Sequence, residues 1–202
     1  MGRVLSLSKD RATVAVKKWI CATWHQFQKR RAILMNQHVS GHLRVKLFNS
    51  TILPVLLYGL SSLTLKPQHH SMIKGARTKM LRNMAGWRRV DGEDWSITMR
   101  RMHSRVEALQ STTSSPDVSE QLFSLKWRLA KRLYTNMTCE KWAPLLLFLP
   151  NGRRRTAGRP PLQWLDDLKQ FRDIIGEGSL EDILRREDLE KRYVEHSMNK
   201  IA

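Results

Sequence analysis

The chain has 202 residues, which is enough for one medium-sized domain or two small ones. It carries 36 Lys and Arg against 18 Asp and Glu, so its formal net charge is +18 and its isoelectric point is about 10.7, values that favour a partner rich in phosphates. The two cysteines, Cys21 and Cys139, are far apart and lack a C-x-x-C spacing, which excludes a disulfide framework and a zinc ribbon.

The periodic segments predict a mostly helical chain, because strict alternation is nearly absent and Leu, Met, Lys and Arg dominate them. A first helix is expected after Asp10, a good N-cap, with an apolar side formed by Val16, Trp19, Ile20, Trp24 and Phe27. A second helical segment is expected from about residue 41 to residue 61. Pro54 lies inside it and should kink it.

The next helix is expected to begin at Pro67, a favourable first-turn residue, and to end before Gly86. Its apolar stripe is Met72, Ala76, Met80 and Met84, widened by Ile73 and Leu81. A further helix should begin at Glu93 and Asp94, whose charges suit a helix N-terminus, and should run to Leu109. Trp95, Met99, Met102 and Val106 are its other apolar positions.

Residues 111–117, STTSSPD, predict a polar linker after a basic helical bundle formed by residues 1–110. Residues 118–175 are expected to be helical around an Arg/Gly/Pro-rich loop at residues 152–161. The helix after the linker shows the stripe Val118, Leu122, Leu125, Leu129 and Leu133, with Phe123, Trp127 and Tyr134 on a neighbouring stripe. Ser179 and Asp182 predict a capping box for a last helix within residues 176–202. The predicted fold class is therefore all-α.

The charge changes along the chain. Residues 1–175 hold 31 basic and 11 acidic residues, a balance of +20, whereas residues 176–202 hold 5 basic and 7 acidic residues, a balance of −2. We therefore expect the acidic-leaning tail to form a solvated surface that differs from the body of the protein.

Cellular location is predicted only in outline. No apolar run approaches the ~18 residues of a membrane span, so we expect no membrane partner, and the unpaired cysteines suit a reducing compartment. The first 31 residues, with eight Lys and Arg and one Asp, also suit a mitochondrial transit peptide. Because the basic pattern continues past residue 31, we favour a helix of the domain itself and an intracellular, nuclear protein.

No catalytic group of residues emerges. Asp166 and Asp167 lie on an expected helix, where adjacent side chains point about 100° apart and cannot both hold one metal ion. We interpret them as surface residues or as partners of neighbouring arginines. His38 and His42 lack a third ligand, and the consecutive His69 and His70 should face apart, so we expect no metal site and no cofactor.

Clusters of basic residues are the positive signal. Phosphate contact and base stacking need cations close to aromatic rings, and several clusters have a tryptophan beside them. Core packing is the alternative for those tryptophans, above all for Trp19 and Trp127. The candidate nucleic-acid-binding residues are Lys17, Lys18, Lys29, Arg30, Arg31, Arg88, Arg89, Arg100, Arg101, Arg153, Arg154, Arg155 and Arg159.

The segment TAGRPP resembles the AT-hook, in which an R-G-R-P core lies in the minor groove of A·T-rich DNA. Ala157 stands where that core has its first arginine, and Pro161 follows Pro160 in place of a basic residue. The glycine and prolines keep this segment out of a helix, which leaves its guanidinium groups able to fork onto phosphate oxygens. Phosphate contact is therefore expected whether or not the segment acts as an AT-hook.

Four stretches occur in the order found C-terminal to the palm of non-LTR (LINE-type) retrotransposon reverse transcriptases. They are VKLFNSTILPVLLYGLSSLTL, TKMLRNMAGWRR, LKWRLAKRLYTNM and NGRRRTAGRPPLQWLDDL. In order, they resemble the LPVLLYG and MLR..G blocks of the helical thumb, a W.GH..R block and a GRP..W.DD block. The resemblance covers roughly residues 14–175, and it implies a thumb-like bundle followed by the connecting region.

The chain departs from this family in two ways. Leu129 and Ala130 stand where the W.GH block has its Gly-His, and no strand-turn-strand with Y/F-x-D-D is found. Asp166 and Asp167 belong to the downstream block instead. The fingers, the palm, the endonuclease and the zinc knuckle of the family are therefore missing from this sequence, and the resemblance implies no chemistry for it.

The expected function is that of a non-catalytic, nucleic-acid-binding remnant of a reverse transcriptase, which contacts the phosphate backbone of RNA or DNA. We expect no small-molecule substrate. An assembly module that docks onto a separately encoded polymerase palm and fingers is one alternative, and an exposed apolar face on residues 43–60 would indicate it. A basic protein with no polyanionic partner and a decayed fragment with no selected role are the others.

Overall fold

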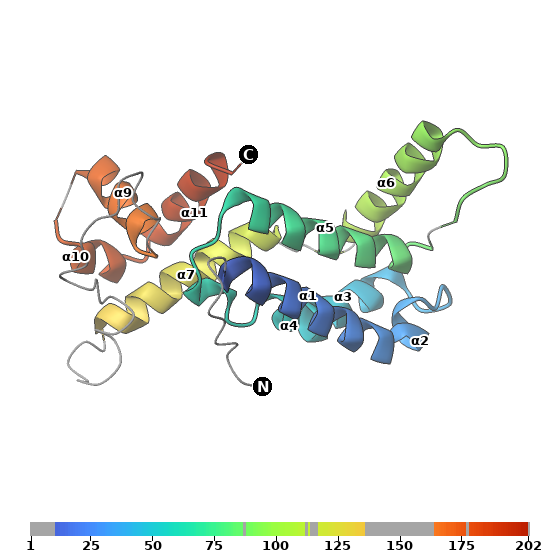
Figure 1. Cartoon of the computed structure of the whole chain (residues 1–202), viewed down its shortest axis with the longest axis horizontal. Helices are drawn as coiled ribbons and strands as arrows, with labels where there is room; N and C mark the ends of the chain where they lie inside the picture. Colours follow the sequence, from blue (N-terminus) through green and yellow to red (C-terminus); the bar gives the residue numbers. More distant parts are fainter. Residues whose placement is uncertain are drawn as a thin grey trace. The chain divides into compact units, whose positions relative to one another are not determined.

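A computed structural model of the chain describes residues 11–86, 88–111, 113, 117–135, 164–176 and 178–201 (Figure 1). Every regular element in these ranges is a helix and none is a strand, which confirms the predicted all-α fold class. The chain divides into two compact units. The first unit is Met1–Leu60 with Leu65–Val118, and the second is Ser61–Thr64 with Ser119–Ala202, so the division after Val118 falls directly beyond the predicted linker.

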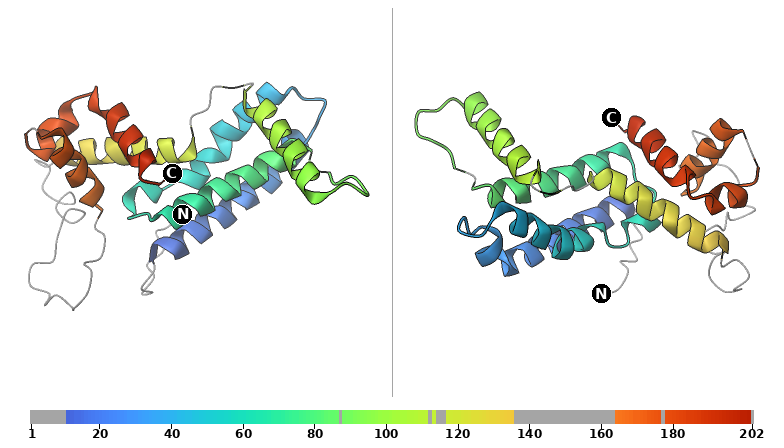
Figure 2. Two further views of the ribbon diagram at one scale, coloured as in Figure 1. Left: turned by 90° about the horizontal axis from the view of Figure 1, so that it is seen from above. Right: turned by 180° about the vertical axis from the view of Figure 1, so that it is seen from behind.

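The first unit is a bundle around two long helices, α1 and α5, which lie side by side (Figures 1 and 2). Helix α4 also packs on α1, and α6 packs on α5 and α3. The helices of this part of the chain are α1 (Arg11–Lys29), α2 (Arg31–Leu34), α3 (Gly41–Thr51), α4 (Leu53–Leu57), the 3-10 helix η1 (Leu60–Ser62), α5 (Pro67–Met84) and α6 (Trp95–Ser111).

The core of the first unit follows the predicted periodicity on α1 and α5. It is built from Phe27, Leu34, Val45, Phe48, Ile52, Met80, Leu81, Met84, Val106 and Leu109. One predicted apolar position is wrong, because Trp95 is more than half exposed, and Leu43 on α3 is equally open to solvent. Trp95 is the first residue of α6, so the helix has no preceding turn that could cover its ring.

The segment predicted as one kinked helix is broken into separate pieces. Helix α3 ends at Thr51, and Pro54 lies in the first turn of α4, where its missing N–H costs no intrahelical hydrogen bond. Gly59 has a φ of 69°, which glycine adopts without strain, and it turns the chain away after α4. The predicted disruption at Pro54 is therefore present, but it is a break between two helices at Ile52 and not a kink within one helix.

One segment of the first part of the chain, Gly41–Ser62, is long and apolar enough to cross a membrane by length and composition alone, contrary to the sequence-based expectation. In the structure it contributes α3, α4 and η1 to the bundle. Its buried side chains are Arg44, Val45, Phe48, Ile52, Leu53, Leu56, Leu57 and Leu60.

A buried arginine joins three parts of the first unit. Arg44 on α3 is only 6% exposed, and its guanidinium donates to the carbonyl oxygens of Met84 at 2.6 Å, Val39 at 3.0 Å and Leu34 at 3.5 Å. Leu34 ends α2 and Met84 ends α5, so the cation lies where the carbonyls of two helix C-termini gather negative potential. Desolvation lowers the pKa of Arg44, but a guanidinium remains charged in proteins.

Helix ends are formed largely as the sequence predicts. Pro67 begins α5 and Gly86 follows it with a φ of 77°, while Ser179 and Asp182 form the expected capping box. His69 and His70 are both buried, which was not predicted from the sequence. The Nδ1 atom of His69 accepts from the Lys66 N–H at 3.0 Å, so this imidazole caps its own helix. Asp10, the predicted first N-cap, lies outside the described residues.

The second unit packs α7 (Val118–Thr135) with three short helices, α9 (Asp166–Ile175), α10 (Leu180–Arg185) and α11 (Leu189–Asn199). Its core is Phe123, Trp127, Ala130, Leu168, Phe171, Leu180, Ile183, Leu184, Leu189 and Tyr193, which confirms the core interpretation of Trp127. The buried residues of α7 come from both predicted stripes, Val118 and Leu122 from the main one and Phe123 and Trp127 from its neighbour, whereas Leu125 of the main stripe is exposed.

Asp167 is the centre of a polar cluster in the second unit. The Lys126 ammonium donates to both of its carboxylate oxygens at 2.7 Å, and the Tyr193 hydroxyl donates to Oδ2 at 2.7 Å. Desolvation lowers the pKa of Lys126, which Asp167 opposes, and burial raises the pKa of Tyr193 well above its ordinary value. The prediction that Asp167 pairs with arginine was wrong, since its partners are a lysine and a tyrosine.

Replacing Arg44 with Met should destabilise the protein by about 2 to 4 kcal/mol, because the carbonyls of Leu34 and Val39 lose this donor and the carbonyl of Met84 loses the closer of its two donors, Gln37 being the other. Chemical denaturation followed by circular dichroism at 222 nm measures this change. Lys46→Met is the matched control, since Lys46 is exposed on the same helix and its replacement should cost less than about 0.5 kcal/mol. Equal stability of the two variants would contradict the role of Arg44.

Replacing Asp167 with Asn should destabilise the second unit by about 2 to 3 kcal/mol, because Lys126 is left largely covered without its counter-charge. The neighbouring variant Asp166→Asn is the control and should cost much less, since Asp166 makes only a minor contribution to the electrostatics of Lys126. Thermal unfolding of both full-length variants gives the comparison. A larger loss for Asp166→Asn would show that the two carboxylates have been assigned the wrong roles.

Candidate nucleic-acid interface

The exposed side of α1 brings together three of the predicted binding residues. Lys17, Lys18 and Lys29 are all exposed, and no ion pair joins them to any residue that the structure describes. The opposite side of the helix carries Val16 and Phe27, both fully buried. Because that apolar side is packed into the bundle, the three ammonium groups are held toward solvent.

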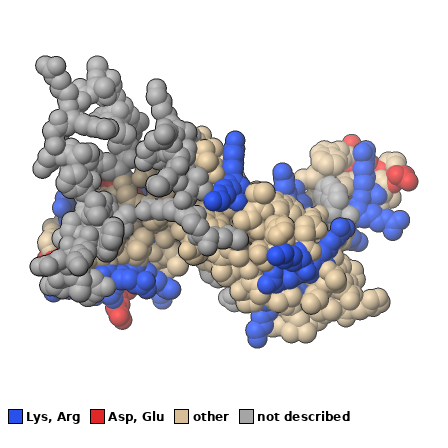
Figure 3. Space-filling model, turned by 60° about the horizontal axis from the view of Figure 1, so that its bottom comes forward, with Lys and Arg blue, Asp and Glu red and all other residues tan. Residues whose placement is uncertain are grey.

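No acidic residue is available nearby in the sequence to neutralise this surface. From Arg11 to Val90 the chain contains fifteen Lys and Arg and no Asp or Glu. This run includes all of the helices from α1 to α5. Figure 3 shows the result on one face of the molecule: Lys and Arg side chains are spread over its central part with no Asp or Glu among them.

Arg30 and Arg31 lie at the turn between α1 and α2 and extend the basic surface. Arg30 donates through Nη1 to the side-chain oxygen of Gln26 at 2.8 Å, and the Nε of Arg31 donates to the sulfur of Met35 at 3.2 Å. These neutral partners hold the side chains in place without cancelling their charge. Both arginines therefore stay available to an anionic ligand.

The arginines around α6 lie in different surroundings. Arg88, Arg89 and Arg100 are exposed, as predicted for binding residues. Asp91, Glu93 and Asp94 follow within the same loop, so the local charge is close to balanced. This part of the first unit is therefore a weaker polyanion site than the exposed side of α1.

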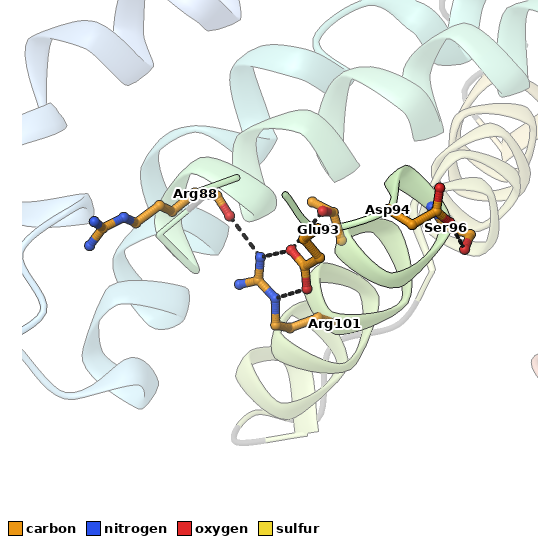
Figure 4. Close-up of polar contacts among 6 residues, drawn as sticks. Arg88, Glu93, Asp94, Ser96 and Arg101 are labelled. Carbon is orange, nitrogen blue, oxygen red and sulfur yellow. Dashed lines mark hydrogen bonds and ion pairs between the residues drawn. The ribbon is translucent and has the colours of Figure 1, made fainter. Parts of the chain in front are cut away.

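Arg101 is occupied inside the protein. Its Nε and Nη2 donate to the two carboxylate oxygens of Glu93 at 3.1 and 2.7 Å, and Nη2 also donates to the Arg88 carbonyl at 3.0 Å (Figure 4). The hydroxyl of Thr98 donates to the same carboxylate at 2.7 Å. The guanidinium of Arg101 thus fastens the loop before α6, and its charge is balanced by Glu93, which makes it a weaker phosphate contact than the sequence alone indicates.

This contact shifts the titration of Glu93. The hydrogen bonds from Arg101 and from Thr98 lower the pKa of Glu93 to about 2. At the N-terminus of α6, Asp94 accepts hydrogen bonds from the Ser96 hydroxyl and from the Ser96 N–H, the latter at 3.1 Å, and these lower its pKa as well (Figure 4). The two carboxylates predicted to begin α6 therefore have different structural roles. Asp94 caps the helix N-terminus, and Glu93 binds Arg101 and so holds the loop before α6 in place.

Arg153, Arg154, Arg155 and Arg159, which the sequence made the most prominent candidates, lie outside the described residues, and so does Trp87. Their role in binding remains a prediction. Within the described ranges, no three His, Cys, Asp or Glu side chains gather so that they could hold a metal ion. The described part of the chain therefore offers a charged surface as its candidate site.

Two signals in the sequence could have distinguished the unpaired basic cluster of α1 from the paired Arg101 before the structure was known. The absence of acids between Asp10 and Asp91 marks the first five helices as a surface without counter-charges of their own, although Lys74 and Arg77 of α5 pair with Asp117 from farther along the chain. The Glu93–Arg101 spacing of eight residues also places an acid and a base on one side of a helix start, about two turns apart. Arg44 gave no such signal, since its burial depends on how α3 packs.

Comparison of the chain with protein-family models, with curated proteins and with solved structures finds no match.

The carboxyl group of Glu93 should titrate with a midpoint near pH 2 when it is followed by carbon-detected NMR in the folded protein. Because the folded pKa lies below the ordinary value of 4.5, the contact stabilises the fold above that pH and is lost as the pH falls toward 2. Arg101→Met should move the midpoint back toward 4.5. A midpoint near 4.5 in the unaltered protein would contradict the contact.

Proposed function

We propose that this protein is a non-catalytic nucleic-acid-binding protein whose first unit contacts the phosphate backbone of RNA or DNA. The observation that carries the proposal is the acid-free run from Arg11 to Val90, with Lys17, Lys18 and Lys29 exposed on one helix inside it. A surface of this kind gains free energy from a polyanion, because binding releases the counterions condensed on the phosphates. The contacts are largely independent of base sequence.

The second unit is less suited to this role among its described residues. Its cations are largely paired: Lys126 with Asp167, Arg128 with Glu190, Arg172 with Asp173, Arg185 with Glu181 and Arg186 with Asp188. Pairs of this kind leave little net charge for an external anion. The arginines of residues 152–161 belong to this unit in sequence and are proposed as an additional contact.

The resemblance to the thumb and connecting region of non-LTR reverse transcriptases supports the proposal from a second direction. A thumb is a helical element that grips a nucleic-acid duplex, which is the kind of contact proposed for the first unit. The assembly-module alternative requires an exposed apolar face on residues 43–60. Seven large apolar residues of that segment are buried within the bundle, which favours the nucleic-acid proposal.

Affinity for a 20-base-pair duplex should fall by about 10³-fold between 50 and 200 mM salt if six or more phosphates are contacted. Fluorescence anisotropy with labelled DNA and RNA measures the slope of log K against log salt. The triple variant K17Q/K18Q/K29Q should make this slope shallower by up to about 2.7, at roughly 0.9 per lost contact. Alanine at Arg153, Arg154, Arg155 and Arg159 should weaken binding as well.

The matched control is R132Q/K191Q/R192Q, which removes the same charge from three exposed positions of the second unit. Its slope should remain close to that of the unaltered protein. If the affinity of the unaltered protein did not depend on salt concentration, the proposed function would be contradicted. If both triple variants lost the same amount of affinity, only the net charge of the protein, and not the position of the α1 lysines, would determine binding.

A further inference from the structure

The lysines on the exposed side of α1 lie along its two borders, with uncharged residues between them. Successive residues of a helix point about 100° apart, so Lys17 and Lys18 lie at opposite borders of the exposed side. Lys29 falls on the same border as Lys18, and Gln28 on the border of Lys17. Val14, Cys21 and His25 occupy the middle, and all of these positions are exposed.

The opposite side of α1 is fixed in the bundle. Val16, Thr23 and Phe27 are fully buried, and the Trp19 ring packs edge-on against Tyr58 with 4.9 Å between centroids. The hydroxyl of Thr13 is hydrogen bonded to the His69 imidazole at 2.8 Å. Trp19 and Thr13 lie on either flank of the buried side, so their contacts prevent α1 from rotating about its axis. The helix therefore always presents the same surface to solvent.

The dimensions of this surface match one kind of nucleic-acid groove. Helix α1 has 19 residues and is therefore about 28 Å long, with a diameter of about 10 to 12 Å. The major groove of B-form DNA is about 12 Å wide and admits such a helix. The major groove of an A-form RNA duplex is deep and narrow, and side chains cannot reach into it.

We infer that α1 lies in the major groove of B-form duplex DNA, with Lys17 directed to the phosphates of one wall and Lys18 and Lys29 to those of the other. This inference rests on the proposed function and names its ligand. The small side chain of Cys21 leaves room for close approach at the middle of the helix. His25 and Gln28 carry the hydrogen-bonding groups that face the base edges, where a Gln amide suits adenine.

Cys21 provides a built-in reporter of this placement, because it is an exposed free thiol at the middle of the face. Cys139 is the only other cysteine, so the full-length Cys139→Ser variant carries a single thiol. The rate of Cys21 alkylation by iodoacetamide, a neutral reagent, is measured alone and with saturating 20-base-pair DNA, RNA duplex of the same sequence, single-stranded DNA or phosphatidylserine vesicles. Anisotropy or co-sedimentation confirms saturation in each case.

We expect duplex DNA to slow the alkylation at least tenfold and duplex RNA to slow it less than twofold. The RNA duplex also controls for the effect of a nearby polyanion on the reactivity of the thiol. Bound duplex DNA with an unchanged alkylation rate would overturn the placement of α1 and leave the proposed function standing. Equal protection by RNA, by single-stranded DNA or by vesicles would overturn the groove assignment, and no binding to any nucleic acid would overturn both proposals.

A charge placed on the face tests the same geometry without the thiol. Gln28→Glu should weaken binding to duplex DNA at least fivefold, because the amide that faces the base edges is replaced by an anion held inside a groove lined by phosphates on both walls. Gln68→Glu is the matched control, since Gln68 is exposed on α5 of the same unit, and it should change the affinity less than twofold. Equal effects of the two variants would contradict the placement of α1 in the groove.

Discussion

The buried guanidinium of Arg44 is the interaction on which the first unit depends most. Within the run from Arg11 to Val90, which contains no carboxylate, Arg44 is satisfied by neutral acceptors, the carbonyls at the ends of α2 and α5, whereas the buried Arg77 pairs with Asp117. Those carbonyls have no intrahelical donor, so Arg44 completes the end of α2 and, together with Gln37, the end of α5. Because α2, α3 and α5 are joined there, the core beneath α1 is held in one arrangement and its basic side is held outward.

The same lack of acids explains why the two units differ in their electrostatics. The second unit surrounds its cations with carboxylates, as in the cluster of Lys126, Asp167 and Tyr193. In the first unit, no carboxylate occurs between Asp10 and Asp91, and the carboxylate of Glu93 is paired with Arg101. The exposed lysines of α1 are left with their full charge. Self-repulsion of such a surface opposes folding, and a bound polyanion relieves it, which ties the stability of this unit to its proposed ligand.

Helix periodicity and capping residues predicted the fold class and several helix limits, because Pro67, Gly86, Ser179 and Asp182 act through their own backbone or a neighbour within one turn. Pairings between distant residues could not be predicted in this way. Lys126 and Asp167 are 41 positions apart, and the burial of Arg44 depends on the rotation of α3 against its neighbours. For the candidate site, the sequence patterns identified the lysines of α1 as binding residues. They ranked Arg101 equally with those lysines, because the pairing of its charge with Glu93 is visible only in the folded structure. They also missed that His69 caps α5.

The central claim is that the basic side of α1 contacts the phosphates of a nucleic acid. Lysine acetylation read out by mass spectrometry, with and without saturating duplex DNA, tests it residue by residue. The account predicts that bound DNA protects Lys17, Lys18 and Lys29 several-fold while Lys131 and Lys191 of the second unit react at unchanged rates. Unchanged acetylation of the three α1 lysines, with protection only at Lys131 and Lys191, would contradict it.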